Sequence, residues 1–369
     1  MASIAAEAPV MSVRDPRQSR RLVRAWLYVV ALMIVAIVFV GGATRMNHAG
    51  LSITEWQPIH GVIPPLSDAE WQDEFAKYQQ IPEYQQLNRG MSLAEFQGIY
   101  WWEWAHRILG RAIGVVVLVP LILLWATGRL EGALKPRLVI IMLGIGLQGA
   151  VGWWMVSSGL SVRTDVSQYR LAIHLTLACI IFAYVLWVSR AIAPSYTPSS
   201  ALTRLGVFLV VVMTLVQIFM GGLVAGLDAG LAYNTWPLMD QSLVPSGLFV
   251  QEPWWRNLFE NAATVQFDHR LGAYTLFALA LLYAFLARRT PQASGAQTIG
   301  ILIFLQAVIG VITLVNVVPM PLALLHQLGA VVVLAYAVTH LRGMLPPLAV
   351  HIEMEVPSPE PAPAPVEAT

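Results

Sequence analysis

Eight long apolar runs constrain the fold of this chain more than any other feature of its sequence. A helix needs about 20 apolar residues to cross the hydrocarbon core of a bilayer. The runs are apolar on all sides and do not alternate with polar residues, which excludes membrane-spanning strands. The sequence therefore predicts an all-α integral membrane protein with eight transmembrane helices, at about 25–43, 99–126, 138–156, 170–189, 205–226, 263–286, 299–318 and 321–341.

The composition agrees with a membrane protein and excludes other classes. Of the 369 residues, 57% are hydrophobic and 12% are charged, and this charged fraction is about half that of an ordinary soluble domain. The 22 basic and 21 acidic residues nearly cancel, so no surface for nucleic acid is predicted. The single cysteine, Cys179, can form neither an internal disulfide nor a cysteine-rich metal site.

Basic residues predict the orientation of the chain in the membrane. Of the 22 basic residues, 13 flank the spans on one side, and such an excess is typical of the cytoplasmic side. They are Arg14, Arg17, Arg20, Arg21, Arg24, Arg129, Lys135, Arg137, Arg190, Arg204, Arg288, Arg289 and Arg342. We expect both termini there, with a cytoplasmic segment 1–24, a cytoplasmic linker 191–204 and a disordered tail 343–369. The large external loop 44–98 is expected to form short interfacial helices.

The chain contains two similar halves. The segment GGATRMNHAGLSITEW, which begins at Gly41, aligns without a gap with GGLVAGLDAGLAYNTW, which begins at Gly221. Further matches follow in the same order: HRILG with HRLGA, LQGAVG with LQAVIG, and LAIHLTLA with LALLHQLGA. Each half has an even number of spans, so both have the same orientation, as in repeats related by an axis along the membrane normal. We therefore expect two tandem pseudo-symmetric four-helix bundles, at 25–190 and 205–342.

Each half carries two histidines inside its spans, where an ionisable residue is costly and is a functional candidate. They are His106 and His174 in the first half, and His269 and His326 in the second. Two imidazoles from two helices of one bundle have the geometry for axial ligation of a haem iron. A single such histidine is more often a helix contact or a proton relay, but four at equivalent positions favour haem. Zinc is less favoured, because two histidines without cysteine are too few for a closed site.

Other polar and aromatic residues are expected to have structural roles. Gln148 and Gln306 are expected to make interhelical hydrogen bonds. The remaining histidines, expected to be solvated or interfacial, are His48, His60, His340 and His351. The tryptophans expected to form an interfacial belt are Trp101, Trp102, Trp104, Trp153 and Trp154.

The two halves differ three residues before a histidine. Glu103 precedes His106, whereas Gln266 precedes His269, and residues at this spacing share a helix face. A carboxylate beside a reacting carbon can act as a base or stabilise positive charge, and an amide cannot. We infer that the first bundle performs chemistry and the second stores or passes electrons. The alternative role for Glu103 is structural, as a helix-start carboxylate paired with Arg107.

Five arginines lie near the predicted haem pockets. Arginine can hold haem propionates through bidentate hydrogen bonds, and contact with lipid phosphates explains the same positions equally well. The candidates are Arg107, Arg111, Arg163, Arg170 and Arg270.

Together these residues resemble the heme A synthase family. The resemblance rests on GGATRM followed by LSITEWQPIHGVIPP, and on EWAHRILGR, FDHRLGAY and LLHQLGA, and it covers nearly all of residues 20–342. The long first loop without a cysteine pair is similar to the proteobacterial and mitochondrial subtype. The resemblance implies an oxidoreductase that converts a ring methyl of heme O to a formyl group, giving heme A for cytochrome c oxidase.

The resemblance also implies roles for particular residues. His106 and His174 would bind the substrate heme O, with Glu103 as the catalytic carboxylate, and His269 and His326 would bind a permanent haem b. It implies a bacterial inner membrane protein with its haem sites toward the periplasm. The implied partners are a heme O synthase, cytochrome c oxidase assembly factors, an electron donor of unknown identity and membrane lipid, and a homo-oligomer is left open.

Three other functions compete with this one. A membrane cytochrome b that only transfers electrons explains the four histidines equally well and explains Glu103 poorly. A transporter is favoured by the parallel repeats, and a haem chaperone would pass heme O onward unchanged. Two axial histidines leave no open position on iron, so either one ligand of the substrate haem departs or water attacks an oxidised methyl carbon.

Overall fold

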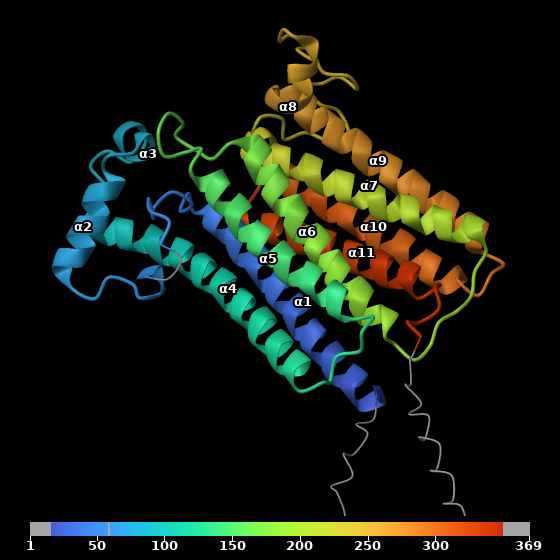
Figure 1. The fold of residues 1–369 in the computed structure, drawn as a ribbon. Helices are drawn as coiled ribbons and strands as arrows, with labels where there is room; N and C mark the ends of the chain where they lie inside the picture. The colour runs from blue at the N-terminus through green and yellow to red at the C-terminus, as the bar shows by residue number, and fades with distance from the viewer. Residues whose placement is uncertain (1–15, 58–59, 350–369) are drawn as a thin grey trace, which may run out of the picture.

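The computed structural model describes residues 16–57 and 60–349. Eight helices in this part are long and apolar enough to cross a bilayer, so the chain is a multi-pass membrane protein (Figure 1). Their bounds are α1 Pro16–Met46, α4 Leu93–Ala126, α5 Lys135–Val156, α6 Gln168–Ala191, α7 Ala201–Gly226, α9 Ala262–Ala287, α10 Ala293–Val315 and α11 Met320–Arg342. The described residues contain no strand beyond one isolated bridge between Met239 and Ser242. The predicted all-α class with eight spans is confirmed.

The observed helices match the expected spans apart from the ends of three helices. α1 begins at Pro16 instead of 25, so residues 16–24 of the expected cytoplasmic segment are its first turns, and α10 begins at Ala293 instead of 299. α4 begins at Leu93 instead of 99, because Ser92 and Glu95 form a capping box in which each side chain accepts a hydrogen bond from the other's backbone N–H. α10 ends before the expected residue 318. Val317 has a φ of 60°, a left-handed conformation that β-branched residues rarely adopt and that cannot continue a helix.

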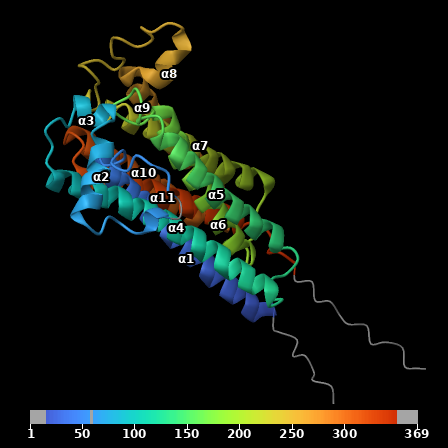
Figure 2. The same ribbon diagram turned by 60° about the vertical axis from the view of Figure 1, so that its left-hand side comes forward.

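The eight helices pack as two groups of four. α1, α4, α5 and α6 form one closed ring of helix contacts, and α7, α9, α10 and α11 form the other (Figures 1 and 2). The two groups meet where α6 and α1 lie against α7 and α11. The contacts thus sort the long helices into two groups of four, and the expected domain boundaries stay a prediction.

Two glycines allow α7 to approach α6 closely. A Cβ atom at Gly222 would lie 2.8 Å from the Cα of Ala172, and one at Gly226 would lie 2.6 Å from the Cα of Gln168. Small residues four positions apart share a helix face, and membrane helices cross closely where they occur. The contact between the two groups therefore depends on the absence of side chains at these positions.

The start of α1 and the end of α11 lie at the same end of the molecule (Figure 1), as an even number of spans requires. The expectation of a disordered tail from residue 343 is wrong for residues 343–349. Leu348 N–H donates to the Ala191 carbonyl at 2.8 Å, and Arg20 donates to the Leu348 carbonyl at 2.9 Å. The rest of the expected tail, and the chain before residue 16, lie outside the described residues.

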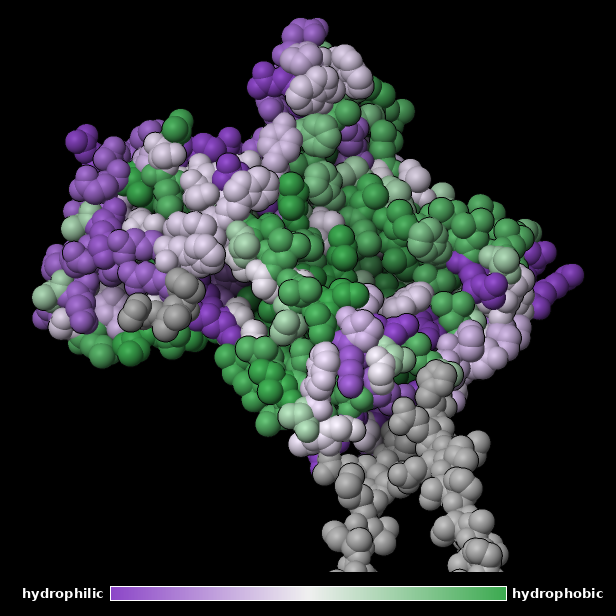
Figure 3. All heavy atoms as spheres, viewed as in Figure 1, coloured by the Kyte–Doolittle hydropathy of each residue, from purple (hydrophilic) through white to green (hydrophobic). Residues whose placement is uncertain are grey.

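The external loop forms a small cap, and its short helices confirm the expectation for this segment. They are η1 His60–Val62, α2 Asp68–Tyr78 and α3 Pro82–Gln86. The buried aromatic residues of the cap come from α2 and from the first turns of α4: Trp71, Phe75, Tyr78, Phe96 and Tyr100. The extra turns of α4 therefore belong to this cap. Figure 3 shows hydrophilic residues over the cap and a hydrophobic band over the long helices.

A second external segment joins α7 to α9. It contains the short helices η2 Ala229–Leu231, η3 Trp254–Arg256 and α8 Asn257–Glu260. It lies at the same end of the molecule as the cap (Figure 1).

Candidate functional site

Each of the four span histidines lies against a glycine of the preceding long helix. The pairs are His106 with Gly41, His174 with Gly152, His269 with Gly221 and His326 with Gly310. A Cβ atom on these glycines would lie 3.0, 3.0, 3.3 and 2.7 Å, respectively, from the nearest imidazole atom. Any side chain at these positions would press on the ring, so the absence of a side chain at the four glycines leaves the space that the imidazoles occupy.

The second histidine pair has a separation that fits a haem between the rings. The ring centroids of His269 and His326 are 6.5 Å apart, and their planes are at 82°. A bond between a metal and an imidazole nitrogen is about 2.0 Å long, so two rings on opposite faces of one iron have centroids roughly 6 Å apart. The residues present therefore fit axial ligation of a haem.

The two glutamines predicted to bond between helices do so, and their partners are the site histidines. Gln148 Nε2 donates to the His174 carbonyl at 2.9 Å and lies 3.1 Å from its Nδ1. Gln306 Nε2 donates to the His326 carbonyl at 2.7 Å and lies 3.1 Å from its Nδ1. Each carboxamide therefore contacts both the backbone and the ring of one histidine.

A third glutamine of this kind was missed from the sequence. Gln217 Nε2 donates to the His269 carbonyl at 2.8 Å and lies 3.0 Å from its Nδ1. The available signal was spacing, because Gln217 stands four residues before Gly221, one helical turn away on the same face.

Glu103 is buried, and both of its carboxylate oxygens are hydrogen-bonded. Oε1 accepts from Arg107 Nε at 3.0 Å and Nη2 at 2.6 Å, while Oε2 accepts from Ser52 Oγ and Ile53 N–H, both at 2.8 Å. The structural pairing with Arg107 that the sequence allowed is therefore present. It holds the carboxylate under the base of the external loop, one turn of α4 from His106.

Gln266 occupies the equivalent place in the second group but has opposite partners. Its Nε2 donates to the carbonyls of Ala229 at 2.8 Å and Tyr233 at 3.2 Å, and its Oε1 accepts from Arg270 at 3.0 Å. The first loop thus presents hydrogen-bond donors to Glu103, and the second loop presents acceptors to Gln266. The difference between the halves extends beyond the side chain into the backbone that surrounds it.

The five candidate arginines all contact external loops or helix ends. Their acceptors are the Ile53 and Glu55 carbonyls for Arg107, the Gln57 carbonyl for Arg111, the Gln168 side chain for Arg163, the Trp154 carbonyl for Arg170 and the Tyr233 carbonyl for Arg270. Arg107 is the most heavily engaged, because it also holds the carboxylate described above.

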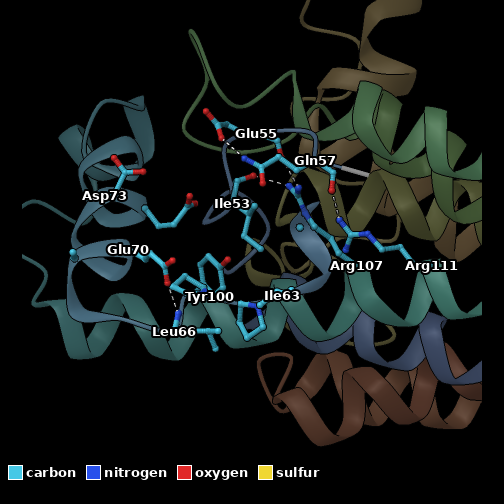
Figure 4. Close-up of a pocket in the computed structure, with 15 residues that line it drawn as sticks. Ile53, Glu55, Gln57, Ile63, Leu66, Glu70, Asp73, Tyr100, Arg107 and Arg111 are labelled. Carbon is cyan, nitrogen blue, oxygen red and sulfur yellow. Dashed lines mark hydrogen bonds between the residues drawn. The ribbon is translucent and has the colours of Figure 1, made fainter. Parts of the chain in front are cut away.

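A cavity of about 520 Å³ lies between the cap and α4. Figure 4 shows Arg107 and Arg111 on one side of it and the acidic residues Glu70 and Asp73 of α2 on the other. The cavity is on the outer side of the arginine–carboxylate pair and not between the histidines. Arg107, which holds the Glu103 carboxylate, lines the cavity, and Glu103 itself does not.

The expectations for the remaining histidines hold only in part. His48 is exposed as expected, but His340 is half-buried, with Nε2 2.8 Å from the Tyr283 hydroxyl, so it is a helix contact between α11 and α9. The side chains of His60 and His351 lie outside the described part of the chain.

The tryptophan belt is only partly as expected. Trp101, Trp102 and Trp154 are exposed, whereas Trp153 is half-buried and stacks on Trp56 of the external loop at 5.8 Å. Trp104 is also half-buried, so two of the five tryptophans pack within the cap.

Comparison with known proteins places the chain in a family. The model of a family described as "Cytochrome oxidase assembly protein" matches residues 24–338. The chain belongs to this family. Three similar relatives are all called heme A synthase. The protein of Chelativorans sp. (strain BNC1) is 59% identical over 92% of this chain and 96% of its own length. That of Mesorhizobium japonicum is 54% identical over 93% and 96%, and that of Brucella ovis is 57% identical over 88% and 92%. The stretch matched by the family model includes all four histidines and Glu103.

Proposed function

We propose that this protein is a heme A synthase that oxidises a ring methyl of heme O to a formyl group. The family and the names of the relatives support this function over electron transfer alone. The observation that carries the chemistry is the contrast between Glu103 and Gln266. These residues occupy equivalent places beside a histidine, and only one of them can accept a proton or carry a negative charge.

His106 and His174 would hold heme O as substrate, and His269 and His326 would hold a resident haem b. The haem b, when bound, supplies one-electron redox chemistry. The four facing glycines keep the imidazoles free of side-chain contact on one side, so the rings can turn toward a porphyrin. The separation of the second pair supports this assignment.

Glu103 would stabilise positive charge that develops on the methyl carbon, or take the proton of an attacking water. A fixed carboxylate lowers the energy of such charge more inside a membrane protein than in water. Arg107, Ser52 and Ile53 orient the carboxylate with four hydrogen bonds. Arg107 would therefore act mainly on Glu103, while Arg111, Arg163, Arg170 and Arg270 remain proposed propionate contacts at the outer edge.

The proposed location is a bacterial inner membrane, with the sites toward the periplasmic side. The arginine-rich end of α1 would then face the cytoplasm. The proposed partners are a heme O synthase as the source of substrate, cytochrome c oxidase assembly factors as recipients, an electron donor and lipid. A homo-oligomer fits the same proposal.

The test is Glu103→Gln, analysed by extracting and chromatographing the haems from cells supplied with heme O. We expect haem binding to persist and formation of heme A to fall at least about 100-fold, the lower range for loss of a general base. Glu252→Gln is the matched control, since it makes the same change at an exposed carboxyl between α7 and α9 and should leave heme A formation unchanged. Normal heme A from the Glu103→Gln variant would overturn the assignment of chemistry to the first bundle. Wild type that yields only unmodified haem would favour the cytochrome b.

A further inference from the structure

Three of the four site histidines have a glutamine beside them, and the fourth does not. In α5, α7 and α10 the glutamine stands four residues before the glycine that faces the histidine. The pairs are Gln148 with Gly152, Gln217 with Gly221 and Gln306 with Gly310. In α1 the residue four positions before Gly41 is Ile37. The position in α1 that corresponds to the three glutamines therefore carries an aliphatic side chain instead of a carboxamide.

The surroundings of His106 show that nothing polar replaces the missing amide. Ile37 reaches α4 one turn beyond His106, where a Cβ atom at Gly110 would lie 3.4 Å from its Cδ1. Among the described residues, no side chain makes a hydrogen bond to the His106 ring. Ile37 therefore packs against α4, and α1 provides no amide for the His106 ring.

The three carboxamides each have an unused acceptor. The Oε1 atoms of Gln148, Gln217 and Gln306 are buried and have no hydrogen-bond partner in the described part of the chain. Space is reserved for two of them, because a Cβ atom at Gly272 or Gly329 would lie 2.3 or 2.1 Å from the nearest oxygen. A buried, unpaired amide oxygen costs about 1–3 kcal/mol, so a partner is expected in the working protein.

The amide nitrogens hold the three histidines at two points. Each nitrogen donates to the backbone carbonyl of its histidine at 2.7–2.9 Å and lies 3.0–3.1 Å from the Nδ1 atom of the same residue. Each carboxamide therefore fixes the backbone and faces the ring of one histidine.

We propose that His106 is the exchangeable axial ligand of the substrate haem, and that the three glutamines are positioning residues that fix the other three histidines. This inference rests on the proposed function. A hydrogen-bonded partner behind a ligating histidine orients it, and the loss of such a partner typically costs about 10–100-fold in metal affinity. The substrate haem thus has one firm ligand, His174, and one weak one. The resident haem has two firm ligands.

This arrangement addresses the need for an open iron position and for release of product. The weak ligand, His106, is on α4, the helix that also carries Glu103. Displacement of His106 would therefore free the side of the iron that faces α4. The firm ligand on α6 would retain the haem while His106 is displaced.

The test uses purified protein loaded with iron protoporphyrin IX, reduced and mixed with carbon monoxide, which binds only where an axial ligand departs. We expect one of the two haems to bind carbon monoxide. His174→Ala, which lacks the firm ligand of the first bundle, should lose that haem and its carbon monoxide complex. Ile37→Gln should slow carbon monoxide binding at least about tenfold. The matched control Ile37→Leu should leave the rate unchanged.

A reciprocal variant tests the glutamines. Gln217→Leu should make the second haem reactive toward carbon monoxide while the reduced bis-imidazole spectrum without the gas persists. Equal rates for wild type and Ile37→Gln, or carbon monoxide binding confined to the second bundle, would overturn the inference. Failure to see any bis-imidazole spectrum would instead contradict the haem assignment and the proposed function with it.

Discussion

At the scale of single residues, the two buried carboxyl groups near the cap have opposite surroundings. Both oxygens of Glu103 are hydrogen-bonded, whereas Glu83 of α3 is 5% exposed and its Oε2 has no partner among the described residues. Burial, followed by the charges of Asp165 and Glu103, raises the pKa of Glu83 to about 8. Glu83 is therefore mostly protonated at neutral pH and costs the cap stability when it ionises.

The cap should lose stability as pH rises, because of Glu83. Between its ordinary pKa of 4.5 and about 8, the folded state binds a proton that the unfolded state has released. The free energy of unfolding therefore falls over this window and levels off above it. Glu83→Gln should unfold at a higher temperature than wild type at pH 8 and at nearly the same temperature at pH 4.5, followed by tryptophan fluorescence.

The exposed carboxyl Asp68 on α2 provides the control for this prediction. Asp68→Asn should unfold with the same pH dependence as wild type between pH 4.5 and 8. A wild-type unfolding temperature that rises over this window would show that ionisation of Glu83 does not destabilise the cap.

At the scale of elements, two glycines of α10 differ in their surroundings. A Cβ atom at Gly310 would lie 2.7 Å from His326 Cε1, whereas one at Gly300 would meet nothing within 4 Å. Gly310→Ala should displace the imidazole and weaken haem retention in the second bundle about tenfold, an effect of the size seen when a ligand loses its orientation. Transfer of haem to a haem-free acceptor protein measures this.

Gly300→Ala is the matched control on the same helix. It should leave the haem transfer rate unchanged and stabilise the helix by about 0.5–1 kcal/mol, because alanine loses less backbone entropy than glycine. Equal haem loss from both alanine variants would mean that Gly310 does not position the His326 ring.

At the scale of the whole molecule, the contact between the two groups of helices depends on the glycine face of α7. Gly222→Leu would drive a side chain into the Cα of Ala172, and backbone atoms cannot move aside as a flexible side chain can. We expect a loss of about 1–3 kcal/mol, the usual cost of overpacking, seen as a lower unfolding temperature in detergent. Gly146→Leu on α5 is the control, since a Cβ atom there meets nothing within 4 Å.

Much of this architecture could be predicted from the sequence, because hydrophobic length and repeated motifs are local properties. The eight spans were predicted from hydrophobic length. The interhelical hydrogen bonds of Gln148 and Gln306 were predicted from their matching places in the repeated motifs. The outer turns of α4 were missed because they are stabilised by a capping box and by the cap, and not by lipid. His340 was misjudged because its partner, Tyr283, is 57 residues away in the chain.

The chemistry of the site was only partly predictable. The contrast between Glu103 and Gln266 is visible in the sequence, but their partners are not. Ser52 and Ile53 contact the carboxylate because of how the loop backbone turns, and no motif encodes that direction. Gln217 was overlooked although it stands four residues before Gly221, because that spacing gains its meaning only once the glycines that face the histidines are known.

The direction of the loop backbones has a consequence for substitutions in the second half. A carboxylate placed at Gln266 would face the lone pairs of the Ala229 and Tyr233 carbonyls, which repel negative charge. A single substitution at position 266 therefore does not reproduce the surroundings of Glu103 in the second half. A carboxylate in the second half would need a rebuilt loop as well as a new side chain at position 266.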